Sequence, residues 1–204
     1  MAFVSGIKPF SPLAVRSIAI IVSSFFTSIA SSVHADLLIF SNGNHWAALQ
    51  GPITANKAEK AIKQLRIKKP KAIILNSHGG DISGAVQLAK YIHNNSINTW
   101  VPPNAVCASG CALIFLAGQE RLCKGDIYLH QFMPTEEHKD KQISLDKAFV
   151  NVQTTIGEIV ILLNAIDAPD FVLERILTQE QLYRLTDADL AKLNTVTNFE
   201  GVLE

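Results

Sequence analysis

Residues 72–132 are the stretch of sequence that decides the predicted fold. They read AIILNSHGGDISGAVQLAKYIHNNSINTWVPPNAVCASGCALIFLAGQERLCKGDIYLHQF. The stretch opens with four consecutive apolar residues, 72–75, and such a run is typical of a strand buried on both faces of a parallel sheet. Gly79-Gly80 then predicts a tight turn, and apolar residues at helical spacing predict a helix that ends near Asn94.

Strand and helix patterns continue to alternate along the chain. The elements predicted for the rest of this stretch are strands over 98–101 and 105–108, a buried helix over 111–117, and a strand or hairpin over 121–129 that ends on His130. Those predicted outside it are a strand over 45–49, a helix over 55–66 capped by Thr54, a long helix over about 144–166 and one or two short helices over 171–194. This alternation predicts a layered α/β fold with a mainly parallel sheet flanked by helices.

The first 35 residues have the pattern of an export signal. Lys8 and Arg16 precede an uncharged apolar core over 17–30, and Val33-His34-Ala35 places small residues at the −3 and −1 positions of a cleavage site before Asp36. We therefore expect a signal peptide over 1–35, a single domain over 36–204, and a periplasmic or otherwise exported protein. The alternative is an uncleaved signal anchor that holds the domain on the membrane.

Charge and cysteine content narrow the classes of partner and cofactor. Lys plus Arg and Asp plus Glu each number 18, so the net charge is zero and no nucleic-acid partner is expected. Cys107, Cys111 and Cys123 do not have the spacing of a zinc site, and no motif implies a metal or another cofactor. In an oxidising compartment one disulfide and one free thiol are expected, with the pairing left open; the alternative is three buried thiols.

Two glycine-containing turns follow buried strands and carry the chemistry that the sequence suggests. Ligands gather where parallel strands end, and a serine at a strand-to-helix turn presents its hydroxyl there. Ser109 is thus a candidate nucleophile and His130 a candidate base, with the N–H groups of Gly80 and Gly110 as oxyanion donors. The alternatives are that Ser109 only caps a helix and that His130 is structural.

These motifs together resemble the proteolytic subunit of Clp protease, of the crotonase superfamily. The family's N-S-P-G-G turn corresponds to 76–80, its A-A-S nucleophile turn to 107–110, and its I-H-Q-P strand end to 129–132. The resemblance implies a Clp-protease/crotonase-like fold with Ser109 as nucleophile, His130 as base, and Gly79, Gly80 and Gly110 around the oxyanion. His78 and Phe132 stand where the family has prolines. The frame Cys107-x-Ser109-x-Cys111 looks more like that of small exported relatives.

The resemblance also suggests a third catalytic residue. Residues 176–182 resemble the family segment that follows its catalytic aspartate, and the family spacing points to Asp170, with Asp167 as its competing neighbour. The carboxylate would hold the imidazole in its productive tautomer. The alternative is that Asp170 only caps a helix that starts at Phe171. A serine–lysine pair is a further variant, but no lysine lies in a recognisable motif.

The function expected from these features is an exported serine peptidase-like hydrolase. A peptide or protein substrate would bind as an extended strand along Gly79–Gly80. A catalytically inactive scaffold that binds peptides or a partner protein is the alternative, and an acyl-CoA enzyme is disfavoured by the export signal. A homo-oligomer through the helix over 144–166 is a further expectation, with packing of that helix on the chain's own sheet as the equal alternative. Membrane contact is expected only through an uncleaved leader.

Overall fold

Strand β3 (Ala72–Asn76), the run of apolar residues that opens the central stretch, lies in the middle of a five-stranded sheet. It pairs in parallel with β2 (Trp46–Gln50) on one side and with β4 (Asn98–Val101) on the other. Both faces of such a strand are covered, which explains why it lacks the apolar–polar alternation of a half-exposed strand. The predicted strands over 45–49, 72–75 and 98–101 are thereby confirmed.

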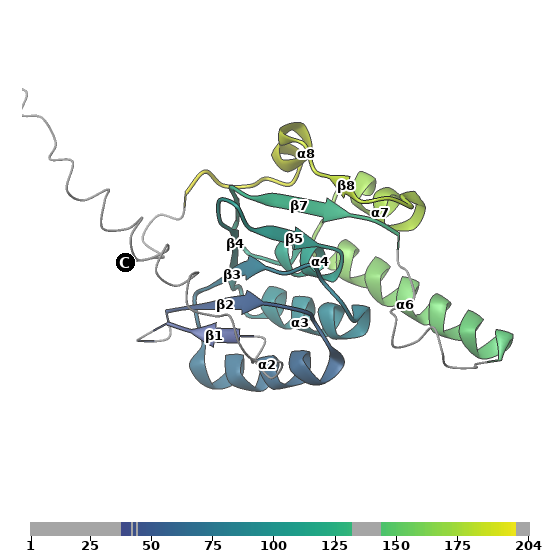
Figure 1. Cartoon of the computed structure of the whole chain (residues 1–204), viewed down its shortest axis with the longest axis horizontal. Coiled ribbons are helices and arrows are strands. Elements are labelled where there is room, and N and C mark those ends of the chain that lie inside the picture. The colour runs from purple at the N-terminus through teal and green to yellow at the C-terminus, as the bar shows by residue number, and fades with distance from the viewer. Residues whose placement is uncertain (1–37, 42, 44, 132–143, 199–204) are drawn as a thin grey trace, which may run out of the picture. The chain divides into compact units, whose positions relative to one another are not determined.

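The computed structural model describes residues 38–41, 43, 45–131 and 144–198 (Figure 1). The sheet order is β1-β2-β3-β4-β6, with β1 (Leu38–Phe40) antiparallel to β2 and β6 (Arg121–Cys123) parallel to β4. The helices are α2 (Ala55–Lys68), α3 (Ile82–Asn94), α4 (Gly110–Leu116), α6 (Leu145–Ala165), α7 (Asp170–Thr178) and α8 (Asp187–Lys192). The chain is therefore a mixed α/β protein with a mostly parallel sheet, and the predicted leader over 1–35 lies outside the described residues.

A second, three-stranded sheet has the order β5-β7-β8. Strand β5 (Val106–Ala108) is parallel to β7 (Asp126–Leu129), and β7 is antiparallel to β8 (Tyr183–Arg184). An isolated bridge from Ser77 to Cys107 joins this sheet to the end of β3. The turn that follows β3 and the turn that follows β5 are therefore adjacent.

The prediction of one strand or a hairpin over 121–129 is wrong. Strands β6 and β7 do not pair with each other, because β6 joins the main sheet and β7 joins the second sheet. Gly125 lies at the crossing, where a Cβ would stand 2.4 Å from the carbonyl oxygens of Pro102 and Ala105. Only glycine allows the chain to pass this close to another backbone.

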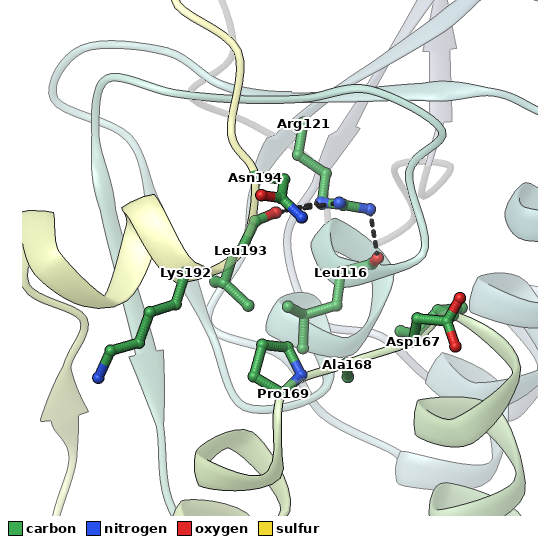
Figure 2. A pocket seen from close by; sticks show the side chains of 9 residues that line it. Leu116, Arg121, Asp167, Ala168, Pro169, Lys192, Leu193 and Asn194 are labelled. Atoms are coloured by element: carbon green, nitrogen blue, oxygen red, sulfur yellow. Dashed lines mark hydrogen bonds between the residues drawn. The ribbon is translucent and has the colours of Figure 1, made fainter.

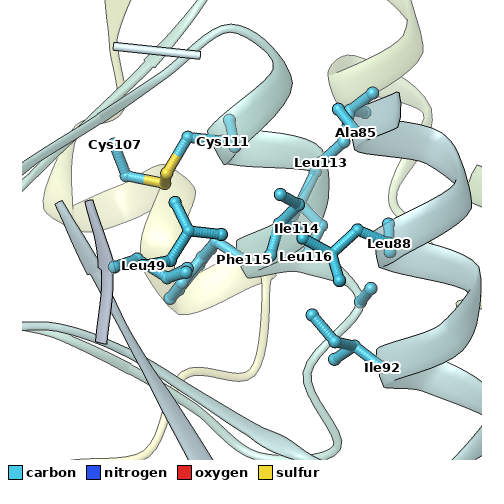
Figure 3. Close-up of a cluster of buried hydrophobic side chains, with 14 of the residues drawn as sticks. Leu49, Ala85, Leu88, Ile92, Cys107, Cys111, Leu113, Ile114, Phe115 and Leu116 are labelled. Carbon is cyan, nitrogen blue, oxygen red and sulfur yellow. A yellow bond between two sulfur atoms is a disulfide. The ribbon is translucent and has the colours of Figure 1, made fainter. Parts of the chain in front are cut away.

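The helices confirm most of the predicted pattern. Thr54 caps α2 by accepting a hydrogen bond from the backbone N–H of Lys57, and every residue of α4 is buried. Figure 3 shows the side chain of Phe115 in α4 beside Leu49 of β2 and near the Cys107–Cys111 pair. Helix α4 is thus the core element that positions Ser109 at its N-terminal end.

Helix α6 is buried over only part of its length. Ile159 and Leu163 pack in the core, whereas Leu145 is 84% exposed and Phe149 is 62% exposed. Figure 1 shows the N-terminal part of α6 extending beyond the other elements. By length and composition alone α6 could cross a membrane, and its buried residues, Ile159, Leu162 and Leu163, lie in its C-terminal part.

Candidate active site

The side chain of Ser109 does not continue the alternation of buried and exposed sides along the strand before it. Cys107 in β5 is fully buried, and a continued strand would place the Ser109 side chain on the same buried face. The backbone turns instead, with φ 56° at Ser109, and the side chain is half-buried. A positive φ is uncommon for a residue with a Cβ and tends to occur at functional turns.

The Ser109 hydroxyl is not used as a helix cap. Ser109 occupies the N-cap position of α4, yet its side chain makes no capping hydrogen bond. Its backbone N–H donates to the Tyr128 carbonyl at 3.0 Å, which ties the turn to β7. The capping alternative therefore lacks the bond that would define it, and the hydroxyl is available for other chemistry.

The Gly79–Gly80 turn packs directly against the Ser109 turn. Gly79 has φ 90°, and a Cβ there would lie 2.6 Å from the Ala108 carbonyl oxygen and 2.9 Å from both the Gly110 nitrogen and the Ser109 Cβ. Gly80 has φ 145°, and a Cβ there would lie within 3.0 Å of three backbone atoms of Ile53. Both glycines are thus required by close backbone contact as well as by φ.

The N–H groups of Gly80 and Gly110 are free to bind an anion. Ile53 takes the polar groups on either side of Gly80, since it donates to the Gly79 carbonyl and accepts from the Asp81 N–H. The N–H groups of Gly80 and Gly110 donate no hydrogen bond to any described residue. A Cβ on Gly110 would be 3.8 Å from the Gly80 nitrogen, so the two groups are neighbours. The N-terminal end of α4 adds a partial positive charge.

Two residues that the sequence did not single out hold these turns together. The buried Ser77 hydroxyl donates to the Gly51 carbonyl at 2.7 Å and accepts from the Gly79 N–H at 3.0 Å. Asn76 accepts a hydrogen bond from the Val106 N–H through Oδ1 at 3.1 Å. In the sequence these two residues stand out only as a polar pair at the end of an apolar run. Their hydrogen-bond partners, which lie 26 and 30 residues away along the chain, could not be identified from it. By contrast, His78 is exposed.

His130 directly follows β7 and is half-buried. Because Ala108 pairs with Tyr128 in parallel register, the ends of β5 and β7 bring Ser109 and His130 to the same edge of the second sheet. No hydrogen bond joins the two side chains in the described part of the chain. Instead, His130 Nδ1 lies 2.5 Å from the Gln131 carbonyl oxygen. Catalytic contacts are often long in unliganded sites.

No hydrogen bond or ion pair joins Asp170 to His130 among the described residues. Asp170 is the exposed first residue of α7, whereas the other end of that helix lies near His130, where the Gln131 N–H donates to the Gln179 carbonyl. A rise of about 1.5 Å per residue separates Asp170 from Thr178 by about 12 Å along the helix. The alternative, that Asp170 caps the helix, is not observed either, because Pro169 occupies the N-cap position of α7. Asp167 lines a different pocket.

The cysteines flanking Ser109 are paired. Cys107 and Cys111 form a disulfide with a Cα–Cα distance of 5.1 Å, and both residues are fully buried (Figure 3). This bond spans the Ser109 turn and ties the end of β5 to the first turn of α4. The remaining thiol, Cys123, lies outside the turn, and burial raises its pKa to about 11.

A pocket lies at the opposite end of α4 from Ser109 (Figure 2). Its lining includes Arg121, whose guanidinium donates to the carbonyls of Leu116, Gly118 and Leu193. These bonds satisfy carbonyls at the C-terminal ends of α4 and α8, which is a structural role. Among the described residues there is no group of three or more histidine, cysteine, aspartate or glutamate side chains that could hold a metal ion.

The chain matches no family model and no curated protein sequence. A function for the chain is therefore inferred from its motifs and from the arrangement of the residues around Ser109.

Proposed function

We propose that the chain is an exported serine peptidase-like hydrolase with a fold like that of the Clp protease proteolytic subunit and the crotonases. Its site consists of Ser109, His130 and the N–H groups of Gly80 and Gly110. The mixed α/β architecture with a mostly parallel sheet is compatible with this fold, and the motif resemblance over 72–132 supports the specific family.

The observation that carries the proposal is the turn at Ser109. A serine hydroxyl without a capping bond stands on a positive-φ strand-to-helix turn, beside two neighbouring backbone N–H groups that have no acceptor among the described residues. An acyl-transfer site needs a nucleophile next to preorganised donors for the oxyanion. A turn built only for stability would not leave its hydroxyl and both N–H groups unused.

The chemistry follows from these positions. Ser109 Oγ attacks the substrate carbonyl while His130 Nε2 takes the hydroxyl proton, and the Gly80 and Gly110 N–H groups bind the oxyanion. The carbon–nitrogen bond then breaks, and the proton passes from His130 to the leaving amine. Water then enters, gives a proton to His130 and attacks the ester carbonyl. The carbon–oxygen bond of the ester breaks, the acid product leaves, and His130 returns the proton to Ser109 Oγ.

A peptide substrate can approach along the free side of Gly80. Ile53 occupies one side of the Gly79–Asp81 segment, which leaves the N–H and carbonyl of Gly80 for a ligand. The N–H serves the oxyanion, and the carbonyl can accept a substrate N–H as an added strand does. Gly80 thus offers the backbone groups of one residue for strand addition, which is fewer than the edge of a whole strand offers.

Export is supported by two independent features. The first 35 residues carry a charged start, an apolar core and a small-residue cleavage pattern. The Cys107–Cys111 disulfide is the kind of bond that persists in oxidising compartments. We therefore place the hydrolase in the periplasm or outside the cell, released from its leader or anchored by it.

A fluorophosphonate probe tests the proposal on the mature chain from Asp36. We expect covalent labelling of the wild type, loss of labelling in Ser109→Ala, and a large loss in His130→Ala. Ser96→Ala is the matched control, because Ser96 is an exposed serine that, like Ser109, has a positive φ, 52°. Labelling that persists in Ser109→Ala would contradict the proposal.

An inactive scaffold is the second candidate function. It is favoured by the missing hydrogen bond between Ser109 and His130 and by the lack of a bond from Asp170 to His130 among the described residues. In that case a folded wild type stays unlabelled at high protein concentration, yet still binds extended peptides. Replacement of Gly80 by alanine would then weaken peptide binding, because the added Cβ collides with Ile53.

A further inference from the structure

We propose that the main-chain carbonyl of Gln131 orients His130 in place of a carboxylate, and that Gln131 is therefore a positioning residue for the base. This inference rests on the proposed function. In most serine–histidine sites an aspartate accepts a hydrogen bond from the Nδ1–H of the histidine. Here the Gln131 carbonyl oxygen lies 2.5 Å from His130 Nδ1.

The carbonyl selects the tautomer that catalysis needs. A carbonyl oxygen can only accept, so the neutral imidazole must carry its proton on Nδ1. Nε2 is then left with its lone pair, as a base that receives the serine proton requires. An imidazolium also donates from Nδ1, so the same carbonyl supports the charged form after proton transfer.

Gln131 is itself held in place through both its backbone and its side chain. The Gln131 backbone N–H donates to the Gln179 carbonyl at 2.6 Å, and its side-chain Nε2 donates to the Leu177 carbonyl at 3.0 Å. Both acceptors lie at the C-terminal end of α7, where helical carbonyls lack intrahelical partners. Helix α7 thereby contributes its end, through Gln131, to the orientation of His130.

No carboxylate makes this contact in the described ranges 38–41, 43, 45–131 and 144–198. Asp170 lies at the far end of α7, about 12 Å from Thr178 by helical rise. Glu174 and Glu180 lie nearer to Gln179 along the chain, but both are exposed and neither bonds His130. A neutral dipole supports an imidazolium less than a full charge does, so a slower site than a complete triad is expected.

Histidine tautomers provide the direct test. In mature protein with ¹⁵N-labelled histidine, the His130 resonances, assigned by their loss in His130→Gln, should show Nδ1 protonated and Nε2 bare in the neutral ring. Gln131→Met keeps the side-chain volume but removes the donor to Leu177, and it should mix the two tautomers. Gln87→Met is the matched control, because Gln87 also donates through its amide, to Ser83 at 3.3 Å, on exposed α3 surface.

Labelling rates provide the second readout. Gln131→Met should slow fluorophosphonate labelling about tenfold or more at an unchanged melting temperature, since a small displacement of a catalytic group is costly. Asp170→Asn, Glu174→Gln and Glu180→Gln should each label within about threefold of wild type, whereas the loss of a triad carboxylate costs about 10⁴-fold.

Each outcome decides between the explanations. A neutral His130 protonated on Nε2, or a loss of about a thousandfold in one of the carboxylate variants, would overturn the inference and assign the orientation to a carboxylate. Absence of labelling in the wild type would instead overturn the proposed function. The tautomer measurement does not depend on activity, so the two failures are distinguishable.

Discussion

Ser109 and His130 were recognisable from the sequence because each directly follows an apolar strand, and the ends of parallel strands meet. The role proposed for Gln131 was not recognisable, because it depends on contacts with Leu177 and Gln179, which lie 46 and more residues away. Asp170 was chosen by the spacing of the family resemblance alone, and spacing does not reveal whether a carboxylate contacts a histidine. Positions set by local strand ends and turns were thus predictable, and contacts set by the tertiary fold were not.

The free thiol of Cys123 should react slowly. Burial raises its pKa to about 11, so at pH 8 only about a thousandth of the thiol is the reactive thiolate. Alkylation by iodoacetamide at pH 8 should be about a hundredfold slower than for free cysteine, and it should rise about tenfold per pH unit up to pH 10. Cys123→Ser should take up no reagent, since Cys107 and Cys111 are bonded. A rate equal to that of free cysteine would contradict the buried position.

At the scale of elements, the approach of the Gly79 turn to the Ser109 turn can be tested by one methyl group. Gly79→Ala should abolish most labelling and lower stability, because its Cβ would meet the Ala108 carbonyl oxygen and Gly110 nitrogen. Gly51→Ala is the control: Gly51 also has positive φ, 77°, but a Cβ there meets nothing within 4 Å. The two variants are compared by labelling rate and urea midpoint. Equal losses of labelling rate and of stability in the two variants would mean that the strain of a positive φ, and not the contact with the Ser109 turn, causes the losses.

The disulfide across the Ser109 turn should stabilise the element junction. The bond joins residues four apart in sequence, and closure of so short a loop contributes about 2 kcal/mol in the chain-entropy view. Cys107→Ala/Cys111→Ala should therefore lower the free energy of unfolding by at least about 2 kcal/mol in urea titrations, and labelling should slow. Cys123→Ala should change neither the free energy of unfolding nor the labelling rate. A double variant with wild-type stability would argue against this role.

The elements themselves were predictable to different degrees. Long apolar or amphipathic segments such as β3 and α3 were predicted close to their observed bounds. Strand β8 was not predicted, since two residues carry no periodicity. The separation of β6 from β7 was missed because it depends on the close packing of Gly125 against Pro102 and Ala105, which no local pattern encodes.

At the scale of the whole molecule, the described residues belong to one compact unit over residues 36–204. The homo-oligomer stays a prediction, and so does the removal of the leader. Expression of the full chain in a secreting bacterium should yield soluble protein whose intact mass corresponds to a start at Asp36. Recovery of the full-length chain in the membrane fraction would instead identify an uncleaved anchor. A charged residue in place of Ala35 should block cleavage and serves as the control.

The most direct measurement of the central claim is peptide mapping of the fluorophosphonate adduct by tandem mass spectrometry on the mature wild-type chain. The account predicts one adduct, on Ser109, that is nearly absent when His130 is alanine. An adduct on another serine, or no adduct on a folded protein, would contradict the assignment of Ser109 and His130 as the nucleophile and base of a hydrolase.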